Sequence, residues 1–432
     1  MKRPLITLLL SGLLLRIVLL FAAYSWDVNS HITWGKEVLE RGITGFYDRP
    51  TIDHFSTIYP NYPPVSIYCF TIMYEVYSLC KIMLWQLNIH IPVFPSALVT
   101  WFDSREAMAG FMKLPAVLAD IGIGYILYKM ILAYKRDHLS ALFAVVFFLF
   151  NPVFWYTSAL WGQIDSIPIF FVLLSFYTLL YTDRKLLPVI IFTLALLSKQ
   201  TSSIFILLLI VAYLKKYSVA SFLKSIGISI VMFWIFFVPF YQQGNILLFP
   251  FQTYIQRILT VSGIPFASNH AFNFWALVTQ WTDIADTTQG LGMSYRAWGY
   301  SIAVLLMIPA YWFACRRVLS SKSLYFTALV TALTVFLFFT RIHERHIQQG
   351  LIFFIPFAVF DKKIRIMYWT ASFIHMANLY HNWSTPRIES LVSVVLSPVT
   401  FNTLTIVLIG IYCYLIYLYF RRSSWSQKDS TV

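Results

Sequence analysis

Apolar runs of about 18 or more residues recur along this 432-residue chain, and they restrict its fold more than any other feature. Each run is long enough to cross the ~30 Å hydrocarbon core of a bilayer as a helix. Only 12% of the residues are charged, against about 25% in a soluble domain. The runs also lack the alternation of β-barrel strands. The sequence therefore predicts an all-α, polytopic membrane protein.

The predicted segments form one domain, residues 1–432, with about 11–13 transmembrane or re-entrant helices. Residues 85–109 are only moderately apolar and are expected to cross back as a short or broken helix. Residues 187–214 are interrupted at Ser198-Lys199-Gln200, which predicts a pair of broken or re-entrant helices with Lys199 at the tip. Continuous spans are expected near residues 5–23, 65–84, 110–134, 140–158, 167–182, 219–240, 297–314, 323–340, 347–360, 366–381 and 402–419.

Short clusters of Lys and Arg between these spans fit cytoplasmic loops, and they account for most of the net charge of +14. Because the clusters are scattered rather than gathered in one stripe, they argue against nucleic acid as a partner. Two large loops, about residues 24–64 and 241–295, then lie on the non-cytoplasmic face. Within the first, His31 to Arg41 has the spacing of a helix lying in the interface plane, and Gly42 is its stop signal.

Polar side chains from distant parts of the chain fall on this same face at one depth. Ionisable residues are costly at membrane depth and are usually functional. The set comprises Asp27, His31, Asp53, His54, Tyr62, Gln163, Asp165, Lys199, His270, Asn273 and the segment Arg341 to His346. Such a set suits transfer from a phosphate leaving group, in which cations hold the phosphate and one carboxylate accepts the proton of the attacking hydroxyl. A glycoside hydrolase would more often carry two paired carboxylates.

Short motifs spread over nearly the whole chain carry a family resemblance. They are Asp27 with Trp34 and Gly42 to Tyr47; Tyr62-Pro63-Pro64; Lys113-Leu114-Pro115 with Asp120; Asn151-Pro152 with Trp161 to Ser166; Ser198-Lys199-Gln200; Asn269 to Asn273 with Trp275; His343 to His346; and Asn378-Leu379-Tyr380. Together, in this order, they resemble the GT-C superfamily of integral-membrane glycosyltransferases. The closest likeness is to prokaryotic mannosyltransferases related to eukaryotic GPI mannosyltransferase II.

This resemblance implies a GT-C-type fold with interfacial helices in the first large outer loop. It also implies a polyprenyl-phosphate-linked hexose donor and an acidic residue of that loop as the base. No nucleotide sugar, no other cofactor and no obligatory metal are implied, although a divalent metal is compatible. Two positions depart from the family pattern. His346 stands where relatives often carry Tyr, and Gln200 stands where they often carry Pro.

The predicted site has three groups of residues. Asp27 is the predicted base, with Asp53 as the alternative base and helix capping as the competing role of Asp27. The predicted ligands of the donor phosphate are Lys199, Arg341, His343, Arg345 and His346. The predicted contacts to sugar or acceptor are Asp53, His54, Tyr62, Gln163, Asp165, His270 and Asn273. No metal site is expected.

Some of these charged residues have a structural alternative. Asp165 either binds sugar hydroxyls or caps the helix that follows it. Arg341 and Arg345 either hold phosphate or are ordinary cations flanking a span, and Glu344 is expected to pair with an arginine.

Two further charged residues fall inside predicted spans. Arg16 snorkels or packs against a neighbouring helix, or else it contacts a lipid phosphate. Asp120 is expected to form a buried ion pair or a helix contact.

The sequence thus predicts an inverting glycosyltransferase that moves a hexose, mannose by the resemblance, to a lipid-linked or glycan acceptor. The active site would face the non-cytoplasmic side of a prokaryotic plasma membrane, or of the ER membrane in a eukaryote. The partners would be the lipid-linked donor, the acceptor and membrane lipids. A transporter or flippase of a lipid-linked sugar would instead show paired repeats and charges through the depth of the bilayer. A non-catalytic membrane subunit of a glycosyltransferase complex is the other alternative.

Overall fold

The computed structural model describes residues 2–53, 55, 57–260, 264–316 and 318–421. In this part of the chain one small hairpin, β1 (Gln289–Gly290) and β2 (Met293–Ser294), accompanies a body of helices. The helices are α1 (Lys2–Leu20), α2 (Trp26–Arg41), α3 (Pro64–His90), α4 (Ser96–Phe102), α5 (Arg105–Lys135), α6 (His138–Leu149), α7 (Pro152–Trp155), the π-helix η1 (Tyr156–Trp161), α8 (Ser166–Tyr181), α9 (Leu187–Ser198), the 3-10 helix η2 (Gln200–Phe205), α10 (Ile206–Lys216), α11 (Val219–Phe237), the 3-10 helix η3 (Val238–Phe240), α12 (Phe249–Thr253), the π-helix η4 (Tyr254–Leu259), α13 (Phe274–Thr279), α14 (Tyr295–Arg316), α15 (Ser321–Phe338), the 3-10 helix η5 (Glu344–Ile347), α16 (Gln348–Ala358), α17 (Lys362–Asn382), α18 (Glu389–Val395) and α19 (Pro398–Arg421).

Seven helices of the described chain are long and apolar enough to cross a membrane: α1, α3, α5, α11 continued by η3, α14, α15 and α19. An eighth crossing is formed if α6 is counted together with α7 and η1, which are bent by 45° relative to it. The helices α8 and α9 are apolar but shorter. The prediction of an all-α, multi-pass membrane protein is confirmed.

An antiparallel pair of helices, α1 and α5, organises the centre of the fold. Arg16 Nε donates to Asp120 Oδ2 at 2.7 Å, and both side chains are fully buried. Farther along the pair, Lys113 Nζ donates to the carbonyl oxygens of Ala23 at 2.7 Å and Ala159 at 2.8 Å. The expected buried ion pair of Asp120 is confirmed, and complete burial leaves Arg16 no access to a lipid phosphate. The end of α1 and the start of α5 therefore lie at the same end of the molecule.

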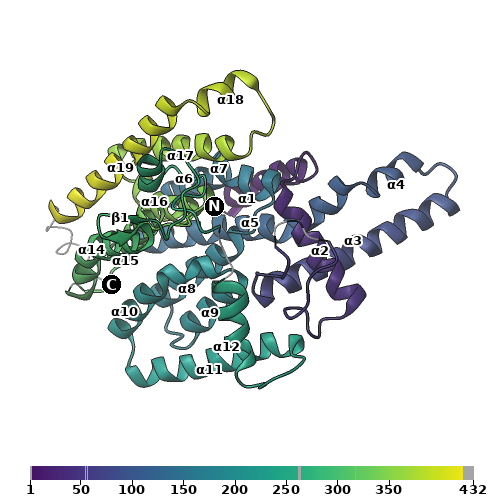
Figure 1. Ribbon diagram of the computed structural model, residues 1–432, viewed down its shortest axis with the longest axis horizontal. Helices are drawn as coiled ribbons and strands as arrows, with labels where there is room; N and C mark the ends of the chain where they lie inside the picture. The colour runs from purple at the N-terminus through teal and green to yellow at the C-terminus, as the bar shows by residue number, and fades with distance from the viewer. Residues whose placement is uncertain (1, 54, 56, 261–263, 317, 422–432) are drawn as a thin grey trace.

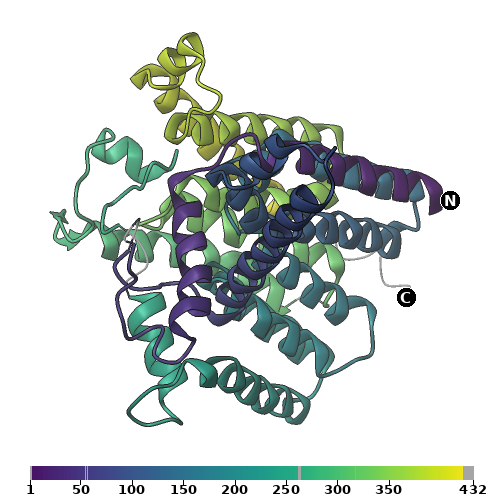
Figure 2. The same ribbon diagram turned by 90° about the vertical axis from the view of Figure 1, so that its right-hand side faces the viewer.

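Residues 85–109, predicted to cross back as a short or broken helix, contain the end of α3, the short helix α4 and the start of α5. The helix α3 continues to His90, and α4 then folds back along it, with a hydrogen bond from Asn88 to Ser96 and an ion pair of Lys81 with Asp103. At seven residues, α4 is ~10 Å long and cannot cross a ~30 Å core. Figure 1 shows α3 and α4 projecting as an arm from the helical body, and in Figure 2 this arm faces the viewer. Through this hairpin the chain returns toward the end of the molecule at which α3 begins.

Two helices are interrupted in the region of the site. The break predicted at Lys199 is confirmed, since this residue is extended between α9 and η2. The span predicted at 140–158 is instead bent after α6. There Pro152 lacks an amide donor, and Asn151 accepts a hydrogen bond from Val153 N to cap a new helix. The π-helix η1 ends at Gly162, which has a φ of +91°.

The helix predicted from His31 to Arg41 exists, but it begins at Trp26 and is more buried than an interfacial helix would be. The beginning of α2 contains Val28, Asn29 and Ser30, which have low helix propensity. Helix propensity alone therefore did not predict that the helix starts at Trp26. A Cβ added to Gly35 would lie 2.6 Å from Phe70 O. The absence of a side chain at Gly35 lets α2 pack closely against α3.

Candidate active site

A cavity of about 570 Å³ opens where these helix ends meet. Its walls come from α2, the stretch before α3, the break at Lys199, the loop at Ile264, the helix α15 and the segment from Arg341 to Gln349. The lining residues are Asp27, Ser30, His31, Trp34, Thr57, Asn61, Tyr62, Lys199, Gln200, Thr201, Ser203, Ile204, Ile264, Pro265, Ala332, Val335, Phe336, Phe339, Arg341, Ile342, His343, Arg345, His346 and Gln349. The distant motifs that carry most of the predicted site therefore do meet in one cavity.

Asp27 lies in the first turn of α2, and its carboxylate is hydrogen-bonded to a residue outside that helix. Its Oδ2 accepts a hydrogen bond from Gln163 Nε2 at 2.5 Å, and Ser25 N donates to Trp161 O at 3.0 Å. These contacts fasten the start of α2 to the loop that follows η1. Gln163 was predicted to contact sugar, but its side chain is fully buried and its amide orients Asp27 instead. Asp27 is not the helix cap, because Ser25 occupies that position.

Lys199 and Arg345 are the two most buried of the Lys and Arg residues that line the cavity, and Asp165 lies between them. Lys199 Nζ donates to both oxygens of Asp165 at 2.9 Å, and Arg345 Nε lies 3.7 Å from Asp165 Oδ2. Burial by itself would raise the pKa of Asp165, but Lys199 and then Arg345 hold it below its ordinary value. The carboxylate makes no capping hydrogen bond to α8. The side chain of Asp165 therefore anchors two cations instead of capping α8, and it is not among the residues that line the cavity.

The segment from Arg341 to His346 contains two further ion pairs. Arg345 Nη1 donates to Glu344 Oε1 at 3.0 Å, which confirms the pairing predicted for Glu344. Burial raises the pKa of Glu344 against the pull of Arg345. Arg341 has its guanidinium on the buried carboxylate of Asp286, with distances of 2.7 and 3.1 Å. Arg341 was predicted to hold phosphate; it lies at the cavity, but its guanidinium is engaged by Asp286, which also lies 3.9 Å from Arg296.

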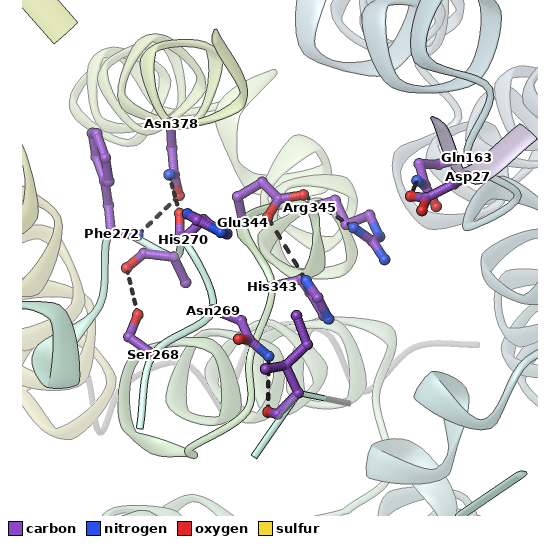
Figure 3. Close-up of polar contacts among 12 residues, drawn as sticks. Asp27, Gln163, Ser268, Asn269, His270, Phe272, His343, Glu344, Arg345 and Asn378 are labelled. Atoms are coloured by element: carbon purple, nitrogen blue, oxygen red, sulfur yellow. Dashed lines mark hydrogen bonds and ion pairs between the residues drawn. The ribbon is translucent and has the colours of Figure 1, made fainter. Parts of the chain in front are cut away.

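A loop from the second large polar region fastens this segment to α17. Asn269 N donates to Ile342 O at 3.2 Å, while Asn378 accepts from Phe272 N and donates to His270 O. Figure 3 shows the bonds of Asn378 to His270 and Phe272, with Arg345 directed away from them toward Asp27 and Gln163. His270, predicted to contact substrate, stands behind the segment rather than in the cavity wall.

Three predicted sugar or acceptor contacts have other positions. Asn273 Oδ1 accepts from Ala276 N at 3.0 Å and caps α13, so its role is structural. Asp53, which was also the alternative base, is exposed and does not line the cavity. His54 lies outside the described residues. Tyr62 does line the cavity, as predicted.

The histidines of the cavity are neutral. Burial lowers the pKa of His31 to about 3 although Asp27 pulls it up, and burial likewise lowers that of His346 to about 3. The pKa of His343 is also far below its ordinary value, first through burial and then through Arg345. With neutral imidazoles, the carboxylates of Asp27, Asp165 and Glu344 oppose Lys199 and Arg345. The formal charge of these groups is −3 + 2 = −1.

Several lining residues had no predicted role. Gln200, Thr201 and Ser203 follow Lys199 directly, so their position beside a break inside an apolar stretch was a usable signal. The apolar wall formed by α15 could not be assigned to the site from the sequence, because there α15 is one of many apolar segments. In the described residues, no cluster of three or more His, Cys, Asp or Glu side chains is arranged to hold a metal ion. No protein-family model and no curated protein matches the chain.

Proposed function

We propose that this protein is an inverting glycosyltransferase. It moves a hexose, taken as mannose, from a polyprenyl-phosphate donor to a hydroxyl of a lipid-linked or glycan acceptor on the non-cytoplasmic face. One observation carries the proposal. Asp27 is held by a neutral amide in the same cavity as the buried cations Lys199 and Arg345, whereas Asp165 and Glu344 are engaged in ion pairs. A carboxylate that is not neutralised by a cation is the better proton acceptor.

The proposed reaction is one displacement at the anomeric carbon. The acceptor oxygen forms the new glycosidic bond, its proton passes to a carboxylate oxygen of Asp27, and the bond from the anomeric carbon to the phosphate oxygen breaks. The donor phosphodiester carries one negative charge, and the released polyprenyl monophosphate gains a second. Protonation of Asp27 removes one negative charge from the cavity as the phosphate gains one. Lys199 and Arg345 contact the phosphate, and the neutral His343 and His346 can donate hydrogen bonds to it.

The shape of the cavity supports a lipid-linked donor. Its lining includes polar groups such as Asp27 and Lys199, while Val335, Phe336 and Phe339 form an apolar wall on the side of α15. A nucleotide sugar would leave this wall against water or polar atoms. An isoprenoid chain would instead cover it, and burial of apolar surface stabilises a complex by about 25 cal/mol per Å².

Exchange of the base tests the proposal. Asp27→Asn keeps the size of the side chain and can still bond to Gln163, but it removes the proton acceptor. Release of polyprenyl phosphate from polyprenyl-phosphate mannose is measured in membrane vesicles of cells that express the full chain, which supply the acceptors. We expect a fall in rate of about 100-fold to 10,000-fold, with little change in the KM for the donor.

Asp53→Asn is the matched control, because Asp53 is an exposed aspartate outside the cavity, and its rate should equal that of the wild type. Unchanged release by Asp27→Asn would overturn the base assignment. If the wild type consumes no polyprenyl-phosphate hexose but moves such a lipid between leaflets, the protein is a flippase and the proposed function is wrong.

A further inference from the structure

His31 is a buried histidine in the cavity wall that the proposed reaction does not use. It lies one helical turn after Asp27 on α2, so both side chains are on the same face of that helix. The residue is 1% exposed, and its ring stacks on Phe70 with the centroids 4.3 Å apart and the planes at 11°. Its Nδ1 has no hydrogen-bond partner. Packing fixes the ring, but a polar atom remains unsatisfied.

Burial without a partner is not sufficient by itself to indicate a ligand. His375 on α17 is also buried, and neither of its ring nitrogens has a partner. The difference is that His31 lines the cavity and His375 does not. An unpaired polar atom is unfavourable when it is buried, and a hydrogen bond between a ligand hydroxyl and His31 would remove that cost.

The surroundings of His31 are suited to one face of a sugar. Trp34 and Tyr62 also line the cavity, with their ring centroids 5.2 Å apart and each within 6.0 Å of the His31 ring. Lys199 Nζ lies 5.4 Å from the centroid of the Tyr62 ring, so the aromatic group adjoins the cations. Ligand pockets combine such apolar and aromatic surfaces with a few polar groups that set orientation.

We propose that His31, Trp34 and Tyr62 form the subsite for the transferred hexose, and that His31 forms a hydrogen bond with one hydroxyl of that sugar. This inference rests on the proposed function. The sugar lies with its C–H face against Trp34 and Tyr62. The phosphate then falls beside Lys199, and the anomeric carbon lies between that phosphate and Asp27. This order is the one that inverting displacement requires.

The role of His31 is to bind rather than to transfer a proton. A histidine whose pKa is about 3 stays neutral throughout the physiological range, with one N–H donor and one acceptor nitrogen. A site that bonds to a hydroxyl discriminates against analogues that lack it, because its own polar atom is then left unpaired. His31 is thus a specificity-determining residue.

The test combines a variant with altered donors. His31→Phe keeps a flat ring that can stack on Phe70 but removes both ring nitrogens. Donor consumption is measured with polyprenyl-phosphate mannose and with its 2-, 3-, 4- and 6-deoxy analogues, using the full chain in the vesicles described above. We expect kcat/KM for the complete donor to fall about 10-fold to 100-fold. For one deoxy analogue, wild type and His31→Phe should be equal, because the bonding partner is missing already.

Two further variants separate binding from folding. His31→Gln retains an amide that can bond to a hydroxyl, and it should keep part of the preference for the complete donor. His90→Phe, at the exposed end of α3, is the matched control and should behave as the wild type. If His31→Phe and His31→Gln lower kcat/KM equally for every donor, the role of His31 is structural and the inference is wrong. If the wild type consumes none of these donors, it is the proposed function that fails.

Discussion

Arg16 and Asp120 bring opposite charges into the middle of two apolar helices, and their contact shows how strongly a single pair can fix this fold. Neither side chain is exposed, and Asp120 also accepts hydrogen bonds from Ser158 at 2.6 Å and Ser166 at 2.5 Å. The sequence showed that each charge needed a partner. It did not show which partner, because the two residues are 104 positions apart. The same holds at the cavity. The sequence showed that the charges of Lys199, Asp165 and Arg345 needed partners, but it did not show which residues would pair.

Arg16→Met tests the central ion pair. It leaves the carboxylate of Asp120 buried without a counter-charge, and removing one partner of a buried pair costs about 3–5 kcal/mol. We expect that loss in the free energy of unfolding, measured by denaturant titration in detergent micelles. The double variant Arg16→Met with Asp120→Leu should recover most of it, because no charge stays buried. Lys36→Met, which breaks an exposed pair with Glu40, is the control and should change the free energy by less than about 0.5 kcal/mol.

At the scale of elements, the placement of Asp27 depends on how closely the loop after η1 approaches α2. Gly162 is the contact point. Its φ of +91° is unfavourable for residues with a side chain, and an added Cβ would collide with Val28 Cγ2 and lie 3.0 Å from Lys113 Cδ. The sequence placed Gly162 in a motif but attached no role to it. The reason for glycine becomes visible only when α2 is packed against the loop.

Gly162→Ala should therefore weaken both folding and turnover. We expect a loss of about 1–3 kcal/mol in the free energy of unfolding, from backbone strain and the collision. Donor consumption should fall further than this loss explains, because Gln163 would move away from Asp27. Gly227→Ala on α11 is the matched control. It meets nothing within 4 Å, and the gain in helix propensity should leave the protein equally or slightly more stable. A Gly162→Ala protein with normal turnover would contradict this account of how Asp27 is held.

At the scale of the whole molecule, α1 and α5 bracket a long insertion that leaves the helical body and returns to it. Residues 24–112 contain α2, α3 and α4, and they begin and end at the same end of the central helix pair. Although α3 is long enough to cross a membrane, α4 is too short to cross back, so we expect the tip of the arm, between α3 and α4, to face the same side as the cavity. The loop after η3 faces that side too, because Gly45 N donates to Phe240 O.

Site-directed labelling tests this arrangement. Single cysteines replace Val93 at the tip, which is 90% exposed, Gln243 after η3, and Asp183 after α8. A membrane-impermeant maleimide added to sealed, oriented vesicles should modify V93C and Q243C from one side and D183C only from the other. Modification of V93C together with D183C would show that α3 crosses the membrane. The background lacks the native Cys69, Cys80, Cys315 and Cys413.

The sequence by itself determined the class of protein, the break at Lys199 and the charged residues that line the cavity. These follow from local properties: the length of apolar runs, the cost of a polar residue inside them, and motif spacing. Only the tertiary structure decided that Asp165 anchors Lys199 and Arg345, that Arg341 pairs with Asp286, and that Asn273 caps α13. It also decided that α4 forms a hairpin with α3. A charge or an amide needs a partner wherever it is buried, but only the packing of distant helices brings one candidate within hydrogen-bonding distance.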